Sequence, residues 1–201
     1  MSKSYSVSEI TKRQLCDSLK ALMGQKPLEK ITIREVTECC GLQRQAFYYH
    51  FEDIYDLVRW MFQQEAVSLL QQHEGALLWQ EGLLQLFHYL QENKAICLCA
   101  LKSISRSHLK RFFQADIYAI IHHTIDGLVE QMQLPSEKVE QELLTHMFVI
   151  ALAGIMESWL LGEFDCTPEE LIHITDLLLQ DQLEGAKMRR DRQAGASRQD
   201  V

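Results

Sequence analysis

The chain has 201 residues, of which 47% are hydrophobic, so it can bury a sizeable core in one large domain or two smaller ones. Glycine (9) and proline (3) are scarce and β-branched runs are few, which favours an all-α fold. The formal net charge of −8 by itself disfavours a nucleic-acid-binding protein, but the distribution of the charges along the chain matters more than their sum. Residues 1–50 carry eight Lys and Arg against five acids, a balance of +3, which leaves −11 on the remaining residues. This asymmetry predicts a small nucleic-acid-binding head on a larger acidic body.

The chain also lacks the patterns of membrane and secreted proteins. No stretch reaches the roughly 18 uninterrupted apolar residues of a spanning helix, and the first residues lack the apolar core of a signal peptide. Six cysteines in such a chain are expected to be free, mostly buried thiols in a reducing compartment. The sequence therefore predicts a cytoplasmic protein without a membrane partner.

Helix starts are marked by capping boxes, in which a hydroxyl residue is followed three positions later by Glu. This pattern occurs at Ser6, Thr32 and Thr167, and Asp53 can cap a further helix. Helices are predicted near 7–24, 32–39, 43–50, 53–73, 79–92, 94–102, 105–132, 136–162 and 168–185. The predicted domains are a helix-turn-helix head over 1–52, a helical regulatory and dimerisation body over 53–186, and a disordered tail over 187–201.

The segment 32–51, TIREVTECCGLQRQAFYYHF, is typical of a helix-turn-helix. Gly41 permits the sharp turn between two short helices, and Leu42 is an apolar plug beneath it. The second helix combines a polar leading edge with an apolar back that includes Phe47 and Phe51. Amide and guanidinium groups at the N-terminus of such a helix suit base edges in the major groove. Residues predicted to contact double-stranded DNA are Thr32, Arg34, Gln43, Arg44, Gln45, Tyr48, Tyr49 and His50.

This segment resembles the TetR family of bacterial regulators. The string from Gly41 to the Phe-Tyr-Tyr-His-Phe of 47–51 is the family's most specific signature, and further matches are Thr32, Arg34, Val36, Leu42 and Leu57. The resemblance implies that Thr32 caps a helix and contacts phosphate. It also implies that residues 43–45 face the groove and that Tyr48 and His50 contact the DNA backbone. Two departures are Ile54, where the family usually has Lys, and Ala46, where it commonly has Ser or Thr.

In the body, the helix over 143–162 is apolar nearly all round, which favours contact with a partner. Together with the helix from 168 it predicts a four-helix interface between two copies of the chain, as the TetR resemblance also implies. A helix buried within its own domain is the alternative. The predicted homodimer interface comprises Leu144, Met147, Ala151, Gly154, Leu161, Leu171, Ile174 and Leu178.

The resemblance further implies that the body responds to a small-molecule effector or a partner protein. Its middle segment, near 86–128, is similar to a subgroup that includes regulators of dihydroxyacetone kinase operons. Aromatic and Met side chains at helical spacing are more often plain core than a binding site. With that alternative open, the predicted pocket is Phe87, Phe112, Phe113, Tyr118, His122, Met147 and Trp159.

Two other classes of function are weaker on the sequence. A zinc- or copper-responsive regulator would use the scattered residues His88, Cys97, Cys99, His108, His122 and His123 as ligands. No two of them have the i, i+4 spacing that places two ligands on one helix face. An enzyme is disfavoured because the chain has no P-loop, no G-x-S-x-G and no H-E-x-x-H, and Glu142 and His146 are one residue too far apart for an E-x-x-H motif. We therefore expect no catalytic residue, metal or cofactor.

Overall fold

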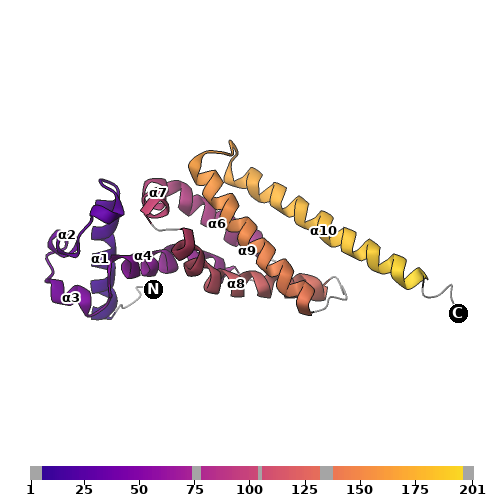
Figure 1. The fold of residues 1–201 in the computed structure, drawn as a ribbon, viewed down its shortest axis with the longest axis horizontal. Coiled ribbons are helices and arrows are strands. Elements are labelled where there is room, and N and C mark those ends of the chain that lie inside the picture. The colour runs from indigo at the N-terminus through magenta and orange to yellow at the C-terminus, as the bar shows by residue number, and fades with distance from the viewer. Residues whose placement is uncertain (1–5, 74–77, 104–105, 132–137, 197–201) are drawn as a thin grey trace. The chain divides into compact units, whose positions relative to one another are not determined.

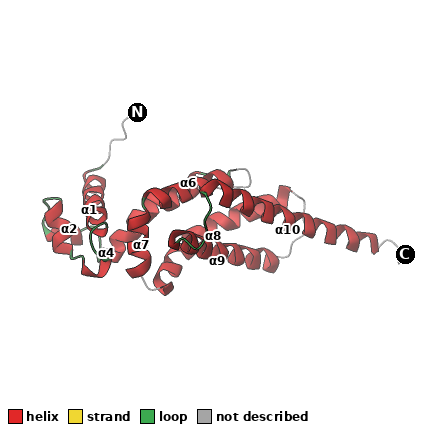
Figure 2. Cartoon of the chain, turned by 90° about the horizontal axis from the view of Figure 1, so that it is seen from above, coloured by secondary structure: helices red, strands yellow, loops and turns green. Residues whose placement is uncertain are grey.

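The computed structural model describes residues 6–73, 78–103, 106–131 and 138–196, with the side chains of 106–116, 190 and 193–196 left out. Within these residues the chain is helical, without strands (Figures 1 and 2), which confirms the predicted all-α class. The helices are α1 (Val7–Met23), α2 (Ile33–Cys39), α3 (Arg44–Tyr48), α4 (Ile54–Phe62), α5 (Ser68–Gln72), α6 (Trp79–Glu92), α7 (Lys94–Ser103), α8 (Arg106–Gln131), α9 (Lys138–Leu161) and α10 (Pro168–Ala196), with a 3-10 turn, η1 (Leu28–Lys30), and a π turn, η2 (Gln63–Val67).

The chain divides into two compact units. Unit 1 contains Met1–Ser68 and Tyr89–Phe112, and unit 2 contains Leu69–His88 and Phe113–Val201. The predicted head lies inside unit 1. The chain passes between the units three times, and each passage falls within a helix: α5, α6 and α8. The segment that starts at Asp53 is therefore one of several covalent connections between them.

Side-chain caps fix the helix starts where the capping boxes predict them. The Thr32 hydroxyl accepts a hydrogen bond from the Glu35 backbone N–H, and the Glu35 carboxylate accepts one from the Thr32 backbone N–H. Thr167 and Glu170 form the same reciprocal pair at the start of α10. Asp53 caps α4 by accepting a 2.8 Å hydrogen bond from the Asp56 backbone N–H. Each cap satisfies backbone donors that the first helical turn leaves open.

The core of unit 1 includes a polar cluster around Glu65, which we call the Glu65 hub. The Glu65 carboxylate lies in the π turn η2 and accepts hydrogen bonds from Lys20 Nζ at 2.7 Å and the Tyr89 hydroxyl at 2.9 Å. Cys16 Sγ lies 3.9 Å from its other oxygen. Burial and, second, the Glu65 charge raise the pKa of the Cys16 thiol to about 12, and the same causes raise that of the Tyr89 hydroxyl. Glu65 thus joins α1, the π turn and α6 through one carboxylate.

In unit 2, α9 ends at a left-handed Gly162 (φ 78°), and α10 leaves this turn in the opposite direction (Figure 1). α10 continues to Ala196, so the tail predicted to be disordered from 187 is helical up to that residue. The disorder was predicted because residues 187–196 have no apolar stripe. Their helix propensity is nevertheless sufficient to extend a helix that has already formed.

By length and composition α9 could also cross a membrane, with 28% of its most apolar window buried in the chain. A core or interface helix passes the same test, so a single helix of this kind is weak support for a membrane span.

Candidate nucleic-acid interface

The turn between α2 and α3 is built around buried side chains. Gly41 adopts φ 69°, a left-handed conformation that favours glycine, and the Leu42 N–H donates to the Thr37 carbonyl at 2.9 Å. Phe47 on α3 is fully buried and packs against Phe51, with ring centroids 5.8 Å apart. These contacts hold the short helix α3 in place, because five residues would not form a stable helix in isolation.

The opposite side of α3 is exposed and rich in hydrogen-bonding groups. Gln43, Arg44 and Gln45 are all exposed, and Gln43 precedes the first helical residue as its N-cap. Tyr48 and Tyr49 are 53% and 83% exposed, unusually high values for aromatic side chains. The surface therefore offers amide, guanidinium and phenol groups from one short helix and its C-terminal end.

His50 is half-buried beside these residues, and its ring lies edge-on to Tyr49 at 5.0 Å between centroids. Burial and, second, the charge of Lys12 lower the pKa of its imidazole, so the ring is neutral at pH 7. A neutral imidazole can donate one hydrogen bond to a phosphate but brings no charge to it.

The remaining two predicted contacts lie at the start of α2 and are already paired within the chain. The Thr32 hydroxyl donates to Glu35 at 2.9 Å, and Arg34 Nε donates to Glu38 at 2.6 Å in an exposed ion pair. Lys26 also donates to Glu35, and the hydrogen bonds from Lys26 and Thr32 lower the pKa of the Glu35 carboxyl to about 2. Phosphate binding by either residue would have to compete with these partners.

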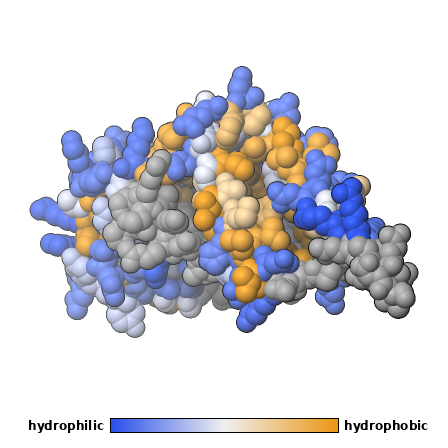
Figure 3. Space-filling model, turned by 45° about the vertical axis from the view of Figure 1, so that its right-hand side comes forward, coloured by the Kyte–Doolittle hydropathy of each residue, from blue (hydrophilic) through white to orange (hydrophobic). Residues whose placement is uncertain are grey.

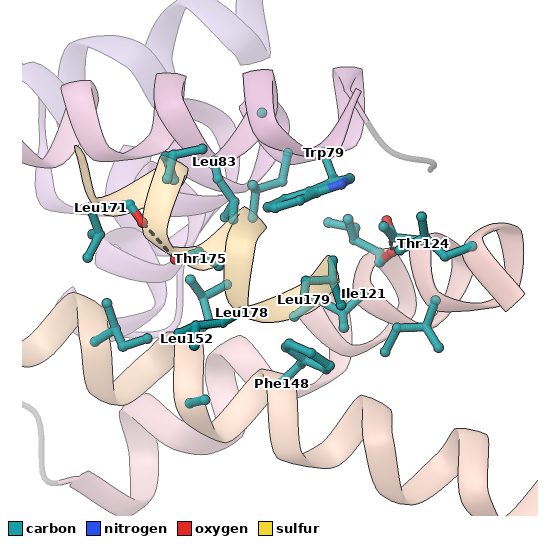
Figure 4. A pocket seen from close by; sticks show the side chains of 18 of the residues that line it. Trp79, Leu83, Ile121, Thr124, Phe148, Leu152, Leu171, Thr175, Leu178 and Leu179 are labelled. Atoms are coloured by element: carbon teal, nitrogen blue, oxygen red, sulfur yellow. Dashed lines mark hydrogen bonds between the residues drawn. The ribbon is translucent and has the colours of Figure 1, made fainter. Parts of the chain in front are cut away.

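The described residues of the predicted pocket meet in pairs but do not line one common pocket. Phe87 is buried, packs edge-on against Trp159 at 5.3 Å, and alone of the predicted set lines the pocket shown in Figure 4. Met147 is 55% exposed, and His122 is paired with Asp126 at 2.8 Å. The Tyr118 ring lies tilted to that of His122 and edge-on to that of His146, and the side chains of Phe112 and Phe113 lie outside the described residues. The sequence pattern selected bulky side chains but could not tell which helix faces converge.

Six of the eight residues of the predicted interface are exposed on α9 and α10, and we call the exposed apolar surface of these two helices the α9–α10 face. Ala151 and Gly154 are exposed, and seven large apolar side chains on it are about half exposed or more. The pattern missed Leu143, Ile150 and Leu177, because a helix that is apolar all round does not reveal its outer side. The exposed set is Leu143 (62%), Met147 (55%), Ile150 (54%), Leu161 (48%), Ile174 (51%), Leu177 (47%) and Leu178 (60%), whereas Leu144 and Leu171 are half-buried. Figure 3, which turns the C-terminal side of the chain forward, shows apolar side chains gathered in a band.

The metal-responsive alternative gains no support from this geometry. His88 is paired with Glu169 at 3.1 Å, and Cys97 is buried in unit 1, where burial raises the pKa of its thiol to about 12. In the described part of the chain no group of three His, Cys, Asp or Glu side chains could hold a metal ion, and the side chain of His108 lies outside it. A metal site needs several ligating side chains close together, with any thiols deprotonated, which these residues do not provide.

These features define a helix-turn-helix protein with a helical body. Residues 15–61 match the model of bacterial regulatory proteins of the tetR family, and residues 78–181 match a transcriptional regulator C-terminal region. The chain therefore belongs to the TetR family of transcriptional regulators, as the resemblance over residues 32–51 predicts. The family assignment disfavours catalysis.

Two similar proteins illustrate the relationship. The chain is 29% identical over 87 residues to the HTH-type dhaKLM operon transcriptional activator DhaS of Lactococcus lactis, a match that spans 43% of this chain and 46% of that protein. The chain thus matches less than half the length of this curated relative. Among solved structures, the dihydroxyacetone kinase operon activator DhaS has a TM-score of 0.70 at 21% identity, covering 88% of this chain and 97% of that one. A transcriptional regulator from Pseudomonas aeruginosa PAO1 has a TM-score of 0.65 at 17% identity, covering 92% and 96%. At these identities the structures establish a shared fold.

Proposed function

We propose that this protein is a cytoplasmic regulator that binds a palindromic operator as a homodimer, with one α3 in each of two successive major grooves. The observation that carries this proposal is the exposed row of Gln43, Arg44 and Gln45 on a helix fixed by fully buried Phe47. Gln can bond adenine bidentately and Arg can bond guanine in the same way. In this arrangement Arg44 reads base edges, while Tyr48, Tyr49 and His50 contact the DNA backbone.

The role of Arg44 can be tested on duplexes selected from a randomised pool by the wild-type protein. Arg44→Ala should weaken binding to the selected sequence by about 1–3 kcal/mol while changing nonspecific binding far less. Lys187→Ala, which removes the same charge from an exposed position on α10, is the matched control and should leave both affinities nearly unchanged. An equal loss on selected and random DNA would make Arg44 a phosphate contact. Failure to select any sequence, with no salt-dependent band shift, would contradict DNA binding itself.

The dimer in this proposal is formed by the α9–α10 face. Contiguous exposed apolar side chains on two adjacent helices are expected to be covered in water, and two copies of a helix pair complete a four-helix bundle. Gly154, exposed and without neighbouring atoms within 4 Å of an added Cβ, gives the helices room for close approach. A two-fold dimer also accounts for a palindromic site, whose half-sites would lie about 34–36 Å apart.

Effector control would act by changing the distance between the two α3 helices. A ligand or partner protein shifts this distance only if it binds one spacing better than the other. DhaS is named as an activator. In this chain too, the effector can therefore stabilise the spacing that fits DNA, and not only the spacing that does not. Spin labels at Gln45, in a variant with exposed Cys39 replaced by Ser, would measure the distance with and without the effector. Unchanged distances alongside a changed DNA affinity would exclude this mechanism.

A further inference from the structure

Unit 2 contains a pocket of about 260 Å³ whose wall is almost wholly apolar. It lies among α6, α8, α9 and α10, and Figure 4 shows side chains from these helices converging on it. Its wall includes Leu83, Phe87, Ile121, Phe148, Leu152 and Leu179. A cavity of this size and composition suits a small organic molecule, because such sites are concave and mainly hydrophobic.

Three polar side chains of the wall are already engaged with the chain, and a fourth, Gln182, lies at its exposed edge. The hydroxyl of Thr124 donates to the Ile120 carbonyl at 3.0 Å, and that of Thr175 donates to the Leu171 carbonyl at 2.8 Å. The His73 ring bonds the Leu69 carbonyl through Nδ1. Lys, Arg, Asp and Glu are absent from the described lining residues. A charged ligand would therefore lose its hydration without gaining a partner of opposite charge.

Trp79 is half-buried at the wall and brings one further donor, its indole N–H, to the edge of the pocket. The indole N–H of Trp79 has no hydrogen-bond acceptor among the residues that the structure describes, and Trp79 lies at the wall in Figure 4. A half-buried indole donor at the edge of an apolar wall can bond a ligand that carries a neutral acceptor, such as a hydroxyl or carbonyl oxygen.

The pocket opens toward the α9–α10 face. Ala151, Leu178 and Gln182 line the pocket and are exposed, and Leu178 is 60% exposed. Each lies on α9 or α10, and Ala151 and Leu178 belong to the α9–α10 face defined above. A second copy of the chain packed on this face would cover the open side of the pocket.

We propose that this pocket binds an uncharged, largely apolar molecule with one or two neutral hydrogen-bond acceptors, and that the second copy of the chain closes over it. The second half of this proposal rests on the homodimer of the proposed function. It links ligand to assembly: a ligand held between the two copies stabilises the dimer, and the dimer tightens the ligand's binding by the same factor.

The ligand class can be tested with 1-decanol and decanoate at pH 8, two probes of nearly equal shape that differ in charge. Binding is followed by tryptophan emission, since the chain has three tryptophans and only Trp79 lines the described pocket. Decanol should shift the emission to shorter wavelength and bind at least about tenfold more tightly than decanoate. The shift should persist in Trp60→Phe, a matched change in unit 1, and largely disappear in Trp79→Phe. Equal or tighter binding of decanoate would overturn the ligand class.

A charge placed on the wall gives a second test. Thr175→Lys puts an ammonium beside the pocket and should reverse the preference in favour of decanoate, whereas Thr175→Val should keep it. An unchanged preference in a folded Thr175→Lys protein would locate decanol elsewhere and overturn the site. If that variant does not fold, the comparison of the two probes on the wild-type chain still decides the ligand class.

Closure by the second copy is tested with Gly154→Arg, a change on the α9–α10 face but outside the pocket lining. This variant should sediment as a monomer and bind decanol at least about tenfold more weakly than the wild type, because the exposed side of the ligand stays in water. A monomeric variant with wild-type decanol affinity would overturn closure while leaving the homodimer intact. A wild-type chain that is monomeric at every concentration would overturn the homodimer and closure together, while the two probes still decide the ligand class.

Discussion

The surface of α3 and the α9–α10 face differ in what each leaves uncovered. Around α3 the exposed groups are polar or amphipathic, led by Arg44 and by Tyr49 at 83% exposure, over the fully buried Phe47. The α9–α10 face instead exposes purely apolar side chains such as Leu143 and Leu178. A polar surface is stable in water and can exchange its hydration for a duplex, whereas an apolar one is favourable only when covered. The contrast predicts a reversible contact at α3 and a lasting one at the α9–α10 face.

The largest effect is expected where the polar surface depends on its buried support. Phe47→Ala should cost about 3–5 kcal/mol of stability, because it removes a fully buried ring that packs against Phe51 and leaves a cavity. Denaturant unfolding measures the loss, and DNA binding should vanish while dimerisation through unit 2 persists. Phe164→Ala, at a 46% exposed position, should change stability by far less. Loss of the dimer together with DNA binding would mean that the two surfaces are not independent.

A charge on the apolar face should act on assembly and leave folding intact. Ile150→Lys introduces an ammonium at a position that is 54% exposed and does not line the pocket. Desolvating it at the centre of an interface should weaken the dimer by about 2 kcal/mol or more. Sedimentation across a concentration series measures this, with Val7→Lys, at an 82% exposed position on α1, as the control. A wild-type dissociation constant for Ile150→Lys would place the interface elsewhere.

Inside unit 1, the Glu65 hub should contribute less than Phe47 because its parts remain partly solvated. Glu65→Gln keeps the shape but removes the negative charge that Lys20 contacts at 2.7 Å, which should cost about 1–3 kcal/mol. Tyr89→Phe removes a single hydrogen bond and should cost about 1 kcal/mol. Thermal unfolding of both variants and of the double mutant measures the coupling. Strictly additive losses would show that the hydrogen bond between Tyr89 and Glu65 contributes nothing to stability.

The smallest effect is expected from pH at the start of α2. The Glu35 carboxyl has a folded-state pKa of about 2, below its usual value of 4.5, chiefly because Lys26 and the Thr32 backbone and hydroxyl donate hydrogen bonds to it. Its contribution to stability is therefore complete above pH 4.5 and is lost as the pH falls toward 2. Melting temperatures of the wild type and Glu35→Gln should converge across this window. Parallel curves would show that Glu35 is not responsible for the acid sensitivity.

The sequence predicted the features that depend on a local pattern and missed those that depend on distant segments of the chain meeting in space. The helix starts at Thr32, Asp53 and Thr167 follow from capping groups within four residues, and all three match the structure. The π turn was not predicted, since five residues do not distinguish a π from an α register. The Glu65 hub was missed because Lys20, Glu65 and Tyr89 are far apart in the chain. The pocket wall likewise needs four helices to meet, which periodicity along one helix does not encode.

The π turn at Gln63–Val67 also bears on how the length of such a chain can change. A π turn accommodates one residue more than the α-helical turn it replaces. Removing one residue within it would restore continuous α-helix from α4 into α5 and keep the following side chains on their present faces. The same deletion earlier in α4 would rotate every later side chain by about 100°. This turn is therefore a position where the connecting segment tolerates a change of length, provided that the contacts of Glu65 with Lys20 and Tyr89 can be given up.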